Sequence, residues 1–202
     1  TSGPVISTTS APDEKLPPVP ITTNVLTSSS KAKARKKFGG EEMVWALPEA
    51  LEQATDFVVA GHKARRFAEA FARRCSSESP LIVDACAGIG GETLALAEVA
   101  PVVAVDLSAA RVACLEANLQ RRRAHYPSRA IVGDVGVECK SWPAAALVHI
   151  DPSRRAGKPG QGVGRRSARY DDLIPGPGVL EGVIRHQAGV GIKLSSAVDF
   201  ES

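Results

Sequence analysis

The segment that most constrains the fold of this chain lies at residues 81–96. A short apolar run ends at Asp84, and small residues then lead through Gly88, Gly90 and Gly91 into a segment with helical composition. This order is typical of a buried parallel strand, a tight glycine turn and the start of a helix. Backbone N–H groups at such a turn can approach a nucleotide-like ligand closely. We therefore expect an α/β fold with a ligand site that begins at this turn.

Strand and helix signals alternate along the rest of the chain. Runs of apolar and β-branched residues predict strands near residues 81–85, 102–106, 129–132, 146–150 and 189–194. Helical periodicity predicts helices near residues 91–99, 108–123 and 178–187. Short buried strands that alternate with helices form a mostly parallel sheet with helices on both faces. The predicted fold is therefore α/β and Rossmann-like.

Three segments are expected along the chain. Residues 1–42 are rich in Ser, Thr and Pro and include a basic run at residues 31–37, so they contain too few apolar groups to offset the entropy of ordering. We expect a disordered arm there. Residues 43–79 carry apolar side chains at near-helical spacing and predict a helical N-terminal extension, either one helix or two with a break at Gly61. Residues 80–202 are expected to form the Rossmann-like domain.

The composition excludes several classes of protein. Hydrophobic residues make up 44% of the chain and charged residues 23%, as in ordinary globular proteins. No apolar run approaches the roughly 20 residues that span a bilayer, so we expect no contact with a membrane. The four cysteines have no CxxC spacing, so neither a metal site nor a disulfide framework is expected. Reduced thiols favour an intracellular location, cytoplasmic or nuclear.

The net charge of +3 is small, but the basic residues are clustered. Clusters lie at residues 31–37, 63–74, 121–129 and 154–169. Such clusters suit a partner that carries phosphates, such as RNA, although solvated helix faces produce them too. The sequence carries no signal for an oligomeric state.

A second acid follows the second predicted strand. Asp106, followed by Leu107, lies 18 residues after Gly88, where a carboxylate can accept hydrogen bonds from a ribose. A dinucleotide fingerprint would need a third glycine, but Thr93 occupies that position. Asp84 would repel a pyrophosphate and suits a cationic group instead. S-adenosylmethionine, which combines a sulfonium and an amino group with an adenosine, fits these residues best.

The next two predicted strands also end in acids. Asp134 and Val135 follow the third strand, where the carboxylate can accept a hydrogen bond from the adenine amino group and the Val135 amide can face a ring nitrogen. Asp151 and Pro152 follow the fourth strand. Asp151 would lie beside the sulfonium methyl, where it could bind a substrate amine and help remove its proton. Pro152 stiffens this turn.

Two arginines follow this turn. Arg154 and Arg155 could form paired hydrogen bonds with a phosphate or carboxylate of the substrate, or could instead pair with surface acids. His149 lies within the buried fourth strand, and we expect it to contribute packing and not to act as a base.

Together these strand-end motifs resemble the class I S-adenosylmethionine-dependent methyltransferases. Residues 84–93 are similar to the cofactor loop of the trimethylguanosine synthase group, the RNA cap guanine-N2 methyltransferases. Residues 51–55, 151–155 and 192–195 look like bacterial-type methyltransferases with a THUMP-like region. The resemblance covers about residues 45–200. It implies two further strands, so we expect a methyltransferase fold truncated after the fifth strand.

The expected function is transfer of a methyl group from S-adenosylmethionine to a nitrogen of an RNA base. The expected cofactor-binding residues are Asp84, Ala85, Gly88, Gly90, Gly91, Thr93, Asp106, Leu107, Asp134 and Val135. Asp151 and Pro152 are the expected catalytic residues, and Arg154 and Arg155 are expected to bind substrate. Three alternatives stay open: a methyltransferase for a small molecule or protein, a non-catalytic cofactor- or RNA-binding module, and a nicotinamide-dependent oxidoreductase.

Overall fold

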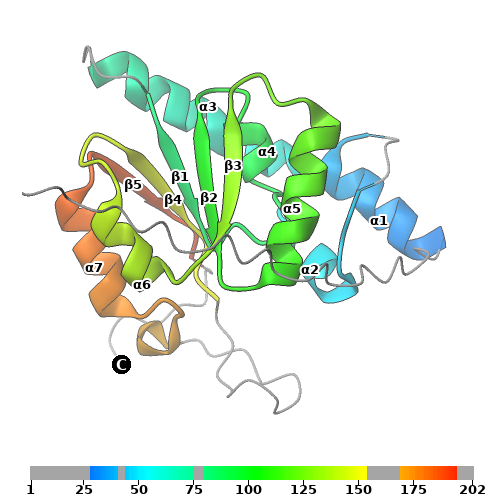
Figure 1. The fold of residues 1–202 in the computed structure, drawn as a ribbon. Coiled ribbons are helices and arrows are strands. Elements are labelled where there is room, and N and C mark those ends of the chain that lie inside the picture. Colours follow the sequence, from blue (N-terminus) through cyan, green and yellow to red (C-terminus); the bar gives the residue numbers. More distant parts are fainter. Residues whose placement is uncertain (1–27, 41–43, 75–79, 154–168, 195–202) are drawn as a thin grey trace, which may run out of the picture.

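The computed structural model describes residues 28–40, 44–74, 80–153 and 169–194. Within these ranges the strands form one parallel sheet in the order β3-β2-β1-β4-β5 (Figure 1). The strands are β1 (Ile82–Ala85), β2 (Val102–Asp106), β3 (Ser128–Val132), β4 (Leu147–Ile150) and β5 (Gly189–Ile192). The predicted α/β, Rossmann-like architecture is confirmed. The strand order reverses between β1 and β4, which is where such sheets bind ligands.

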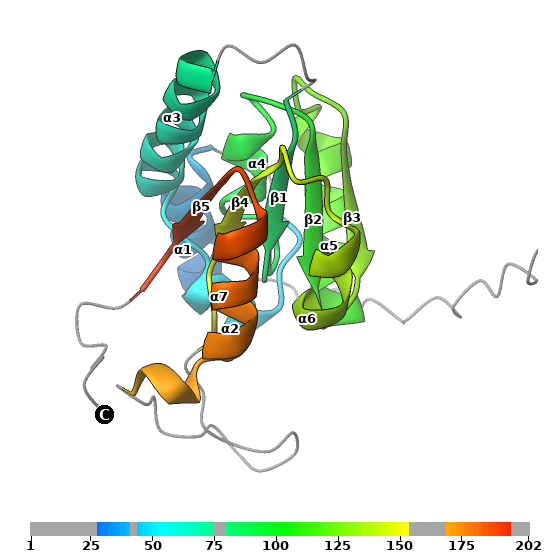
Figure 2. The same cartoon turned by 90° about the vertical axis from the view of Figure 1, so that its left-hand side faces the viewer.

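Helices cover both faces of the sheet (Figure 2). One face packs against α1 (Ser28–Phe38), α2 (Pro48–Gln53), α3 (Phe57–Arg74), α4 (Thr93–Leu96) and α5 (Ala109–Arg122). The other face packs against α6 (Val135–Glu138) and α7 (Pro177–His186). Because both faces are buried, the strands need apolar residues at nearly every position. In β1, for example, Ile82 joins the first core and Val83 the second.

Helix α1 corrects the expectation of a disordered arm for part of that segment. Residues 28–38 form a helix, and Ala34 and Phe38 are buried against the first core. The side chain of Lys37 donates a hydrogen bond to the carbonyl oxygen of Glu52 at 2.6 Å. Ala34 and Phe38 are spaced i, i+4 and therefore lie on the same face of the helix. This small apolar stripe packs the helix against the first core. Residues 1–27 lie outside the described ranges.

Three other features of the helices differ from the prediction. The break between the two N-terminal helices falls at residues 54–56, and Gly61 lies inside α3. The helix after β1 is shorter than expected, at Thr93–Leu96. Helix α6, a single turn after β3, was not predicted. Helix lengths are set here by tertiary packing more than by local periodicity. No helix among the described residues is both long and apolar enough to cross a bilayer.

We predict opposite effects on stability for two glycine-to-alanine changes. Gly90 has φ +97°, and a Cβ there would overlap Cδ1 of the fully buried Leu115, so Gly90→Ala should lower the free energy of unfolding by about 2 kcal/mol or more. Gly61 lies in a helix with open space around its Cα, so Gly61→Ala should raise it by about 0.5–1 kcal/mol. Urea denaturation of the two variants measures both changes. If the two substitutions changed the free energy of unfolding equally, the positive φ and the close contact with Leu115 described for Gly90 would be contradicted.

Candidate functional site

A cavity of about 700 Å³ lies at the carboxyl ends of the strands. Its wall is formed by the turns that follow β1, β2, β3 and β4, by the end of β5 and by α2. This volume is typical of small-molecule sites. The carboxyl edge beside a strand-order reversal is the position where open α/β sheets bind ligands.

The cavity brings together most of the predicted site residues. Those in its wall are Gly88, Gly91, Asp106, Leu107, Asp134, Val135, Asp151 and Pro152. Four others lie outside the cavity wall, at the end of β1 and the start of α4: Asp84, Ala85, Gly90 and Thr93. Arg154 and Arg155 lie outside the described residues. The residues predicted from the ends of the strands therefore form part of the wall of one cavity.

Asp106 is held in place by the backbone on both sides. Its Oδ2 accepts a hydrogen bond from the Gly88 N–H at 2.9 Å, and its Oδ1 accepts one from the Ser108 N–H at 2.9 Å. These bonds tie the turn after β1 to the turn after β2. The side chain is 6% exposed and lines the cavity. Each carboxylate oxygen retains a second lone pair for a ligand.

Asp134 has a structural role as well as its place in the cavity wall. It is the N-cap of α6, and its Oδ1 accepts a hydrogen bond from the Gly136 N–H at 2.7 Å. Val135 is buried in the second core and also lines the cavity. The cap therefore fixes both residues at the edge of the sheet.

Asp84 faces the protein interior. It is 1% exposed; its Oδ2 accepts a hydrogen bond from the Thr93 hydroxyl, and its Oδ1 lies 2.8 Å from Nδ1 of His149. The ammonium of Lys63 lies 3.2 Å from Nε2 of the same ring. Since an ammonium can only donate, Nε2 accepts and the ring proton sits on Nδ1, facing Asp84.

This contact corrects the expectation that His149 contributes packing alone. The ring is buried, but it links Asp84 on β1 to Lys63 on α3. Local sequence gave no signal of it, because the partners lie 65 and 86 positions away along the chain.

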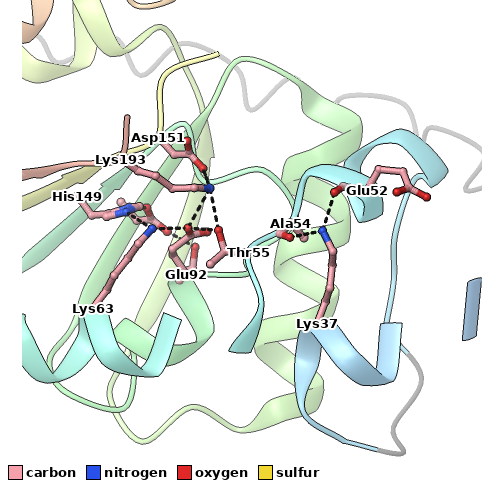
Figure 3. Close-up of polar contacts among 11 residues, drawn as sticks. Lys37, Glu52, Ala54, Thr55, Lys63, Glu92, His149, Asp151 and Lys193 are labelled. Atoms are coloured by element: carbon pink, nitrogen blue, oxygen red, sulfur yellow. Dashed lines mark hydrogen bonds and ion pairs between the residues drawn. The ribbon is translucent and has the colours of Figure 1, made fainter. Parts of the chain in front are cut away.

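Glu92 is the centre of a second, connected set of contacts (Figure 3). Its Oε1 accepts hydrogen bonds from the Thr55 hydroxyl and, at 2.7 Å, from Lys63, and it lies 3.6 Å from the ammonium of Lys193. Burial alone would raise the pKa of Glu92. The hydrogen bond from Lys63 and the positive charges of Lys63 and Lys193 outweigh burial and lower the pKa of Glu92 to about 2.

Lys193 joins this set to Asp151. Its ammonium donates to Oδ2 of Asp151 and, at 2.9 Å, to the hydroxyl of Thr55. Burial raises the pKa of Asp151, and the charge of Lys193 opposes that rise. For Lys193 itself, burial lowers the pKa, but Glu92 and Asp151 together raise it. The Lys193 ammonium thus lies against the Asp151 carboxyl group just beyond the ends of the adjacent strands β4 and β5.

Four of these residues were not predicted as site residues: Thr55, Lys63, Glu92 and Lys193. Lys193 directly follows the observed β5, but the predicted strand at residues 189–194 extended over it, so the strand-end signal was missed. Parallel strands bring all such positions to one edge. No comparable signal exists for Lys63, which lies on a helix outside the sheet.

Acidic side chains dominate the cavity wall. The charged wall residues are Glu52, Glu92, Asp106, Asp134, Asp151, Arg111 and Lys193. Lys33 pairs with Glu52, and two lysines surround Glu92, whereas Asp106 and Asp134 accept from backbone N–H groups. Negative charge that is not offset by a neighbouring cation favours a cationic ligand over a polyanion such as a pyrophosphate.

Comparison with known proteins bears on the fold. No protein-family profile matches the chain, and no curated protein matches it. A protein of Porphyromonas gingivalis W83, named as a candidate methyltransferase, superposes with a TM-score of 0.60 at 16% sequence identity over 83% of this chain. This chain therefore shares the Rossmann-like fold of that protein. The chain spans 39% of the length of that protein.

Two further Rossmann-like methyltransferase structures superpose less well. One is a candidate rRNA methylase from Clostridium thermocellum, with a TM-score of 0.45 and 16% identity over 63% of this chain and 65% of that one. The other is an rRNA methylase from Streptococcus thermophilus, with a TM-score of 0.43 and 14% identity over 65% and 69%. No conclusion about this chain depends on either of them.

The lowered pKa of Glu92 predicts a specific dependence of stability on pH. A carboxyl whose pKa falls from 4.5 to about 2 on folding stabilises the protein above pH 4.5, and this stabilisation is lost as the pH falls toward 2. Between pH 6 and pH 3, Glu92 should account for a loss of about 2 kcal/mol in the free energy of unfolding. Denaturation experiments on Glu92→Gln should show that its free energy of unfolding falls by about 2 kcal/mol less than that of wild type between pH 6 and pH 3. The exposed Glu98→Gln is the control, and identical profiles for Glu92→Gln and wild type would contradict the charged cluster.

Proposed function

We propose that this chain is an S-adenosylmethionine-dependent methyltransferase that methylates a nitrogen of an RNA base. The observation that carries the proposal is the meeting of three strand-end acids, Asp106, Asp134 and Asp151, in the wall of one cavity of suitable size. Along the sheet edge these acids lie in the order Asp134, Asp106, Asp151, and this order matches adenine, ribose and reacting methyl along one ligand. The fold similarity is consistent with this reaction class.

The cofactor would lie across the ends of β1 and β2. Asp106 would accept hydrogen bonds from the ribose hydroxyls, with Leu107 beside them. Asp134 and Val135 would hold the adenine, and the turn from Gly88 to Gly91 would hold the amino-acid part. The cavity suits this ligand because its excess of acids favours a cation. That turn would be held in position by residues outside the cavity wall, namely Asp84, Ala85, Gly90 and Thr93.

The chemistry at Asp151 follows from its position. When bound, S-adenosylmethionine would supply an electrophilic methyl group on a sulfonium. Asp151, which accepts a hydrogen bond from Lys193, would also accept one from the N–H of the substrate and take up its proton as the nitrogen bonds to the methyl carbon. The carbon–sulfur bond would break in the same step, and S-adenosylhomocysteine would leave as a neutral thioether. Pro152 would limit movement of this turn. Most of the acceleration would come from alignment of the nitrogen with the methyl group.

The RNA part of the proposal is supported by exposed basic residues on α1. This helix packs against α2, which forms part of the cavity wall. The side chains of Arg35 and Lys36 on α1 are exposed. Exposed cations of this kind can bind the phosphates of an RNA. Arg154 and Arg155, next to Asp151 in sequence, are proposed to add to this contact.

Calorimetric titration with S-adenosylhomocysteine tests the cofactor assignment. Wild type should bind it, and Asp106→Asn should weaken binding at least about tenfold because a charged acceptor to the ribose is lost. Asp171→Asn, which changes an exposed acid that is not part of the cavity wall, is the control and should bind as wild type does. NAD should not bind. Binding of NAD in place of S-adenosylhomocysteine would instead identify an oxidoreductase.

A transfer assay tests the reaction and the acceptor. With radiolabelled S-adenosylmethionine, label should enter unfractionated cellular RNA and not unfractionated cellular protein. Asp151→Asn should reduce this transfer by about 10²-fold or more, as expected for loss of a general base, while S-adenosylhomocysteine affinity stays the same. Label in protein alone would overturn the RNA assignment. Full activity of Asp151→Asn would overturn the role of the carboxylate.

A further inference from the structure

Lys193 lies where four segments of the chain meet at the cavity wall. It directly follows β5, and its ammonium donates a hydrogen bond to Oδ2 of Asp151, which follows β4 (Figure 3). It also donates, at 2.9 Å, to the Thr55 hydroxyl between α2 and α3, and it lies 3.6 Å from Oε1 of Glu92, which follows the turn after β1. One cation therefore joins the acid proposed to accept the substrate proton to two groups that take no part in the reaction.

These two groups are themselves fixed. Glu92 is 6% exposed and accepts hydrogen bonds from Thr55 and, at 2.7 Å, from Lys63 on α3. The Thr55 hydroxyl donates to Glu92 and accepts from Lys193, so its donor and one of its acceptor positions are both used. A lysine ammonium is otherwise a point charge on a flexible chain. Here its position is set before any substrate binds.

The anchored ammonium orients the carboxylate of Asp151. Lys193 bonds Oδ2 of Asp151, so Oδ1 can accept a hydrogen bond from a substrate N–H in the cavity. The main chain of Asp151 is held as well, because its N–H donates to the carbonyl oxygen of Ala85 at 3.3 Å. A catalytic group contributes most when neighbouring contacts lock its own side chain. Lys193 supplies such a contact for Asp151.

Lys193 also opposes protonation of Asp151. Burial raises the pKa of the Asp151 carboxyl and the negative charge of Glu92 raises it further, whereas the charge and hydrogen bond of Lys193 lower it. Among the described residues, the other titratable groups that face Asp151 are His149 on β4 and Cys86 after β1. Nε2 of His149 accepts a hydrogen bond, so this ring is neutral. Burial raises the pKa of the Cys86 thiol to about 12, so the thiol is neutral too.

We infer that Lys193 is a positioning residue for methyl transfer, which aims the Asp151 carboxylate at the substrate nitrogen and holds it ready to take up the proton. The inference rests on the proposed function, since it concerns the same transfer. Lys193 acts through Asp151 and does not touch the reacting atoms. The substrate proton passes to Asp151, whose side chain is 29% exposed, and from there to solvent. Thr55 and Glu92 take part by holding the Lys193 ammonium.

The pH dependence of transfer tests this role. With radiolabelled S-adenosylmethionine and unfractionated cellular RNA, Lys193→Met should lose more transfer at low pH than at high pH, because its Asp151 is protonated more readily. We expect the ratio of the wild-type rate to the Lys193→Met rate to be at least about tenfold larger at about pH 5.5 than at about pH 9. Lys193→Arg should recover part of the transfer at the lower pH, since the cation returns with a different shape. Lys140→Met, the same change at an exposed lysine outside the cavity wall, is the matched control and should follow wild type.

The ionisation of Asp151 can also be followed by NMR without RNA or cofactor. In protein labelled with ¹³C at the aspartate carboxyl carbons, the Asp151 signal is identified by its absence from Asp151→Asn. The pKa that this signal reports should be higher in Lys193→Met than in wild type, because burial and Glu92 then act unopposed. Thr55→Val, which removes one anchor of the ammonium and keeps its charge, should change both measurements in the same direction by less. Circular dichroism spectra equal to that of wild type show that the variants are folded.

The outcomes separate this inference from the proposed function. An equal loss of transfer by Lys193→Met at every pH, or an unchanged pKa of Asp151 in that variant, would overturn the positioning role while leaving the reaction class intact. Transfer by Lys193→Met as fast as by wild type would overturn it in the same way. Absence of transfer to RNA by wild type at every pH would overturn the proposed function and the role of Lys193 with it, whatever the pKa of Asp151.

Discussion

The ion pairs around Glu92 are the contacts on which the geometry of the cavity most depends. Glu92 follows the turn after β1, and it is bound by Lys63 from α3, by Lys193 after β5 and by Thr55 between α2 and α3. A buried carboxylate is costly to remove from water unless cations and donors surround it. The chain therefore has to bring four separate segments to one point. That point lies at the carboxyl edge of the sheet.

The same contacts set the direction of Asp151. Lys193 bridges Glu92 and Asp151, so the acid after β4 is tied to the acid after the β1 turn through one ammonium. Asp106, in contrast, is held by the backbone N–H groups of Gly88 and Ser108. The two acids at the cavity wall are therefore oriented by different means, Asp151 by an ammonium and Asp106 by amides of the main chain.

The fold could be predicted from sequence because its central strands β1, β2 and β4 are buried on both faces. Runs such as residues 102–105 are apolar at every position, and each begins and ends within two residues of the observed strand. The acids at strand ends could be placed together for the same reason, since parallel strands share an edge. Helix α1 was missed because its buried apolar residues, Ala34 and Phe38, lie in or beside a strongly basic segment. The pairing of Lys63 with His149 and Glu92 depends on tertiary contacts that no local pattern encodes.

A crystal structure of the chain with S-adenosylhomocysteine would test the proposed site most directly. We expect both ribose hydroxyls within hydrogen-bond distance of the Asp106 carboxylate, and the ligand sulfur on the side of the cavity nearest Asp151. A ligand bound with its ribose away from Asp106, or bound outside the cavity, would contradict the proposed placement of the cofactor.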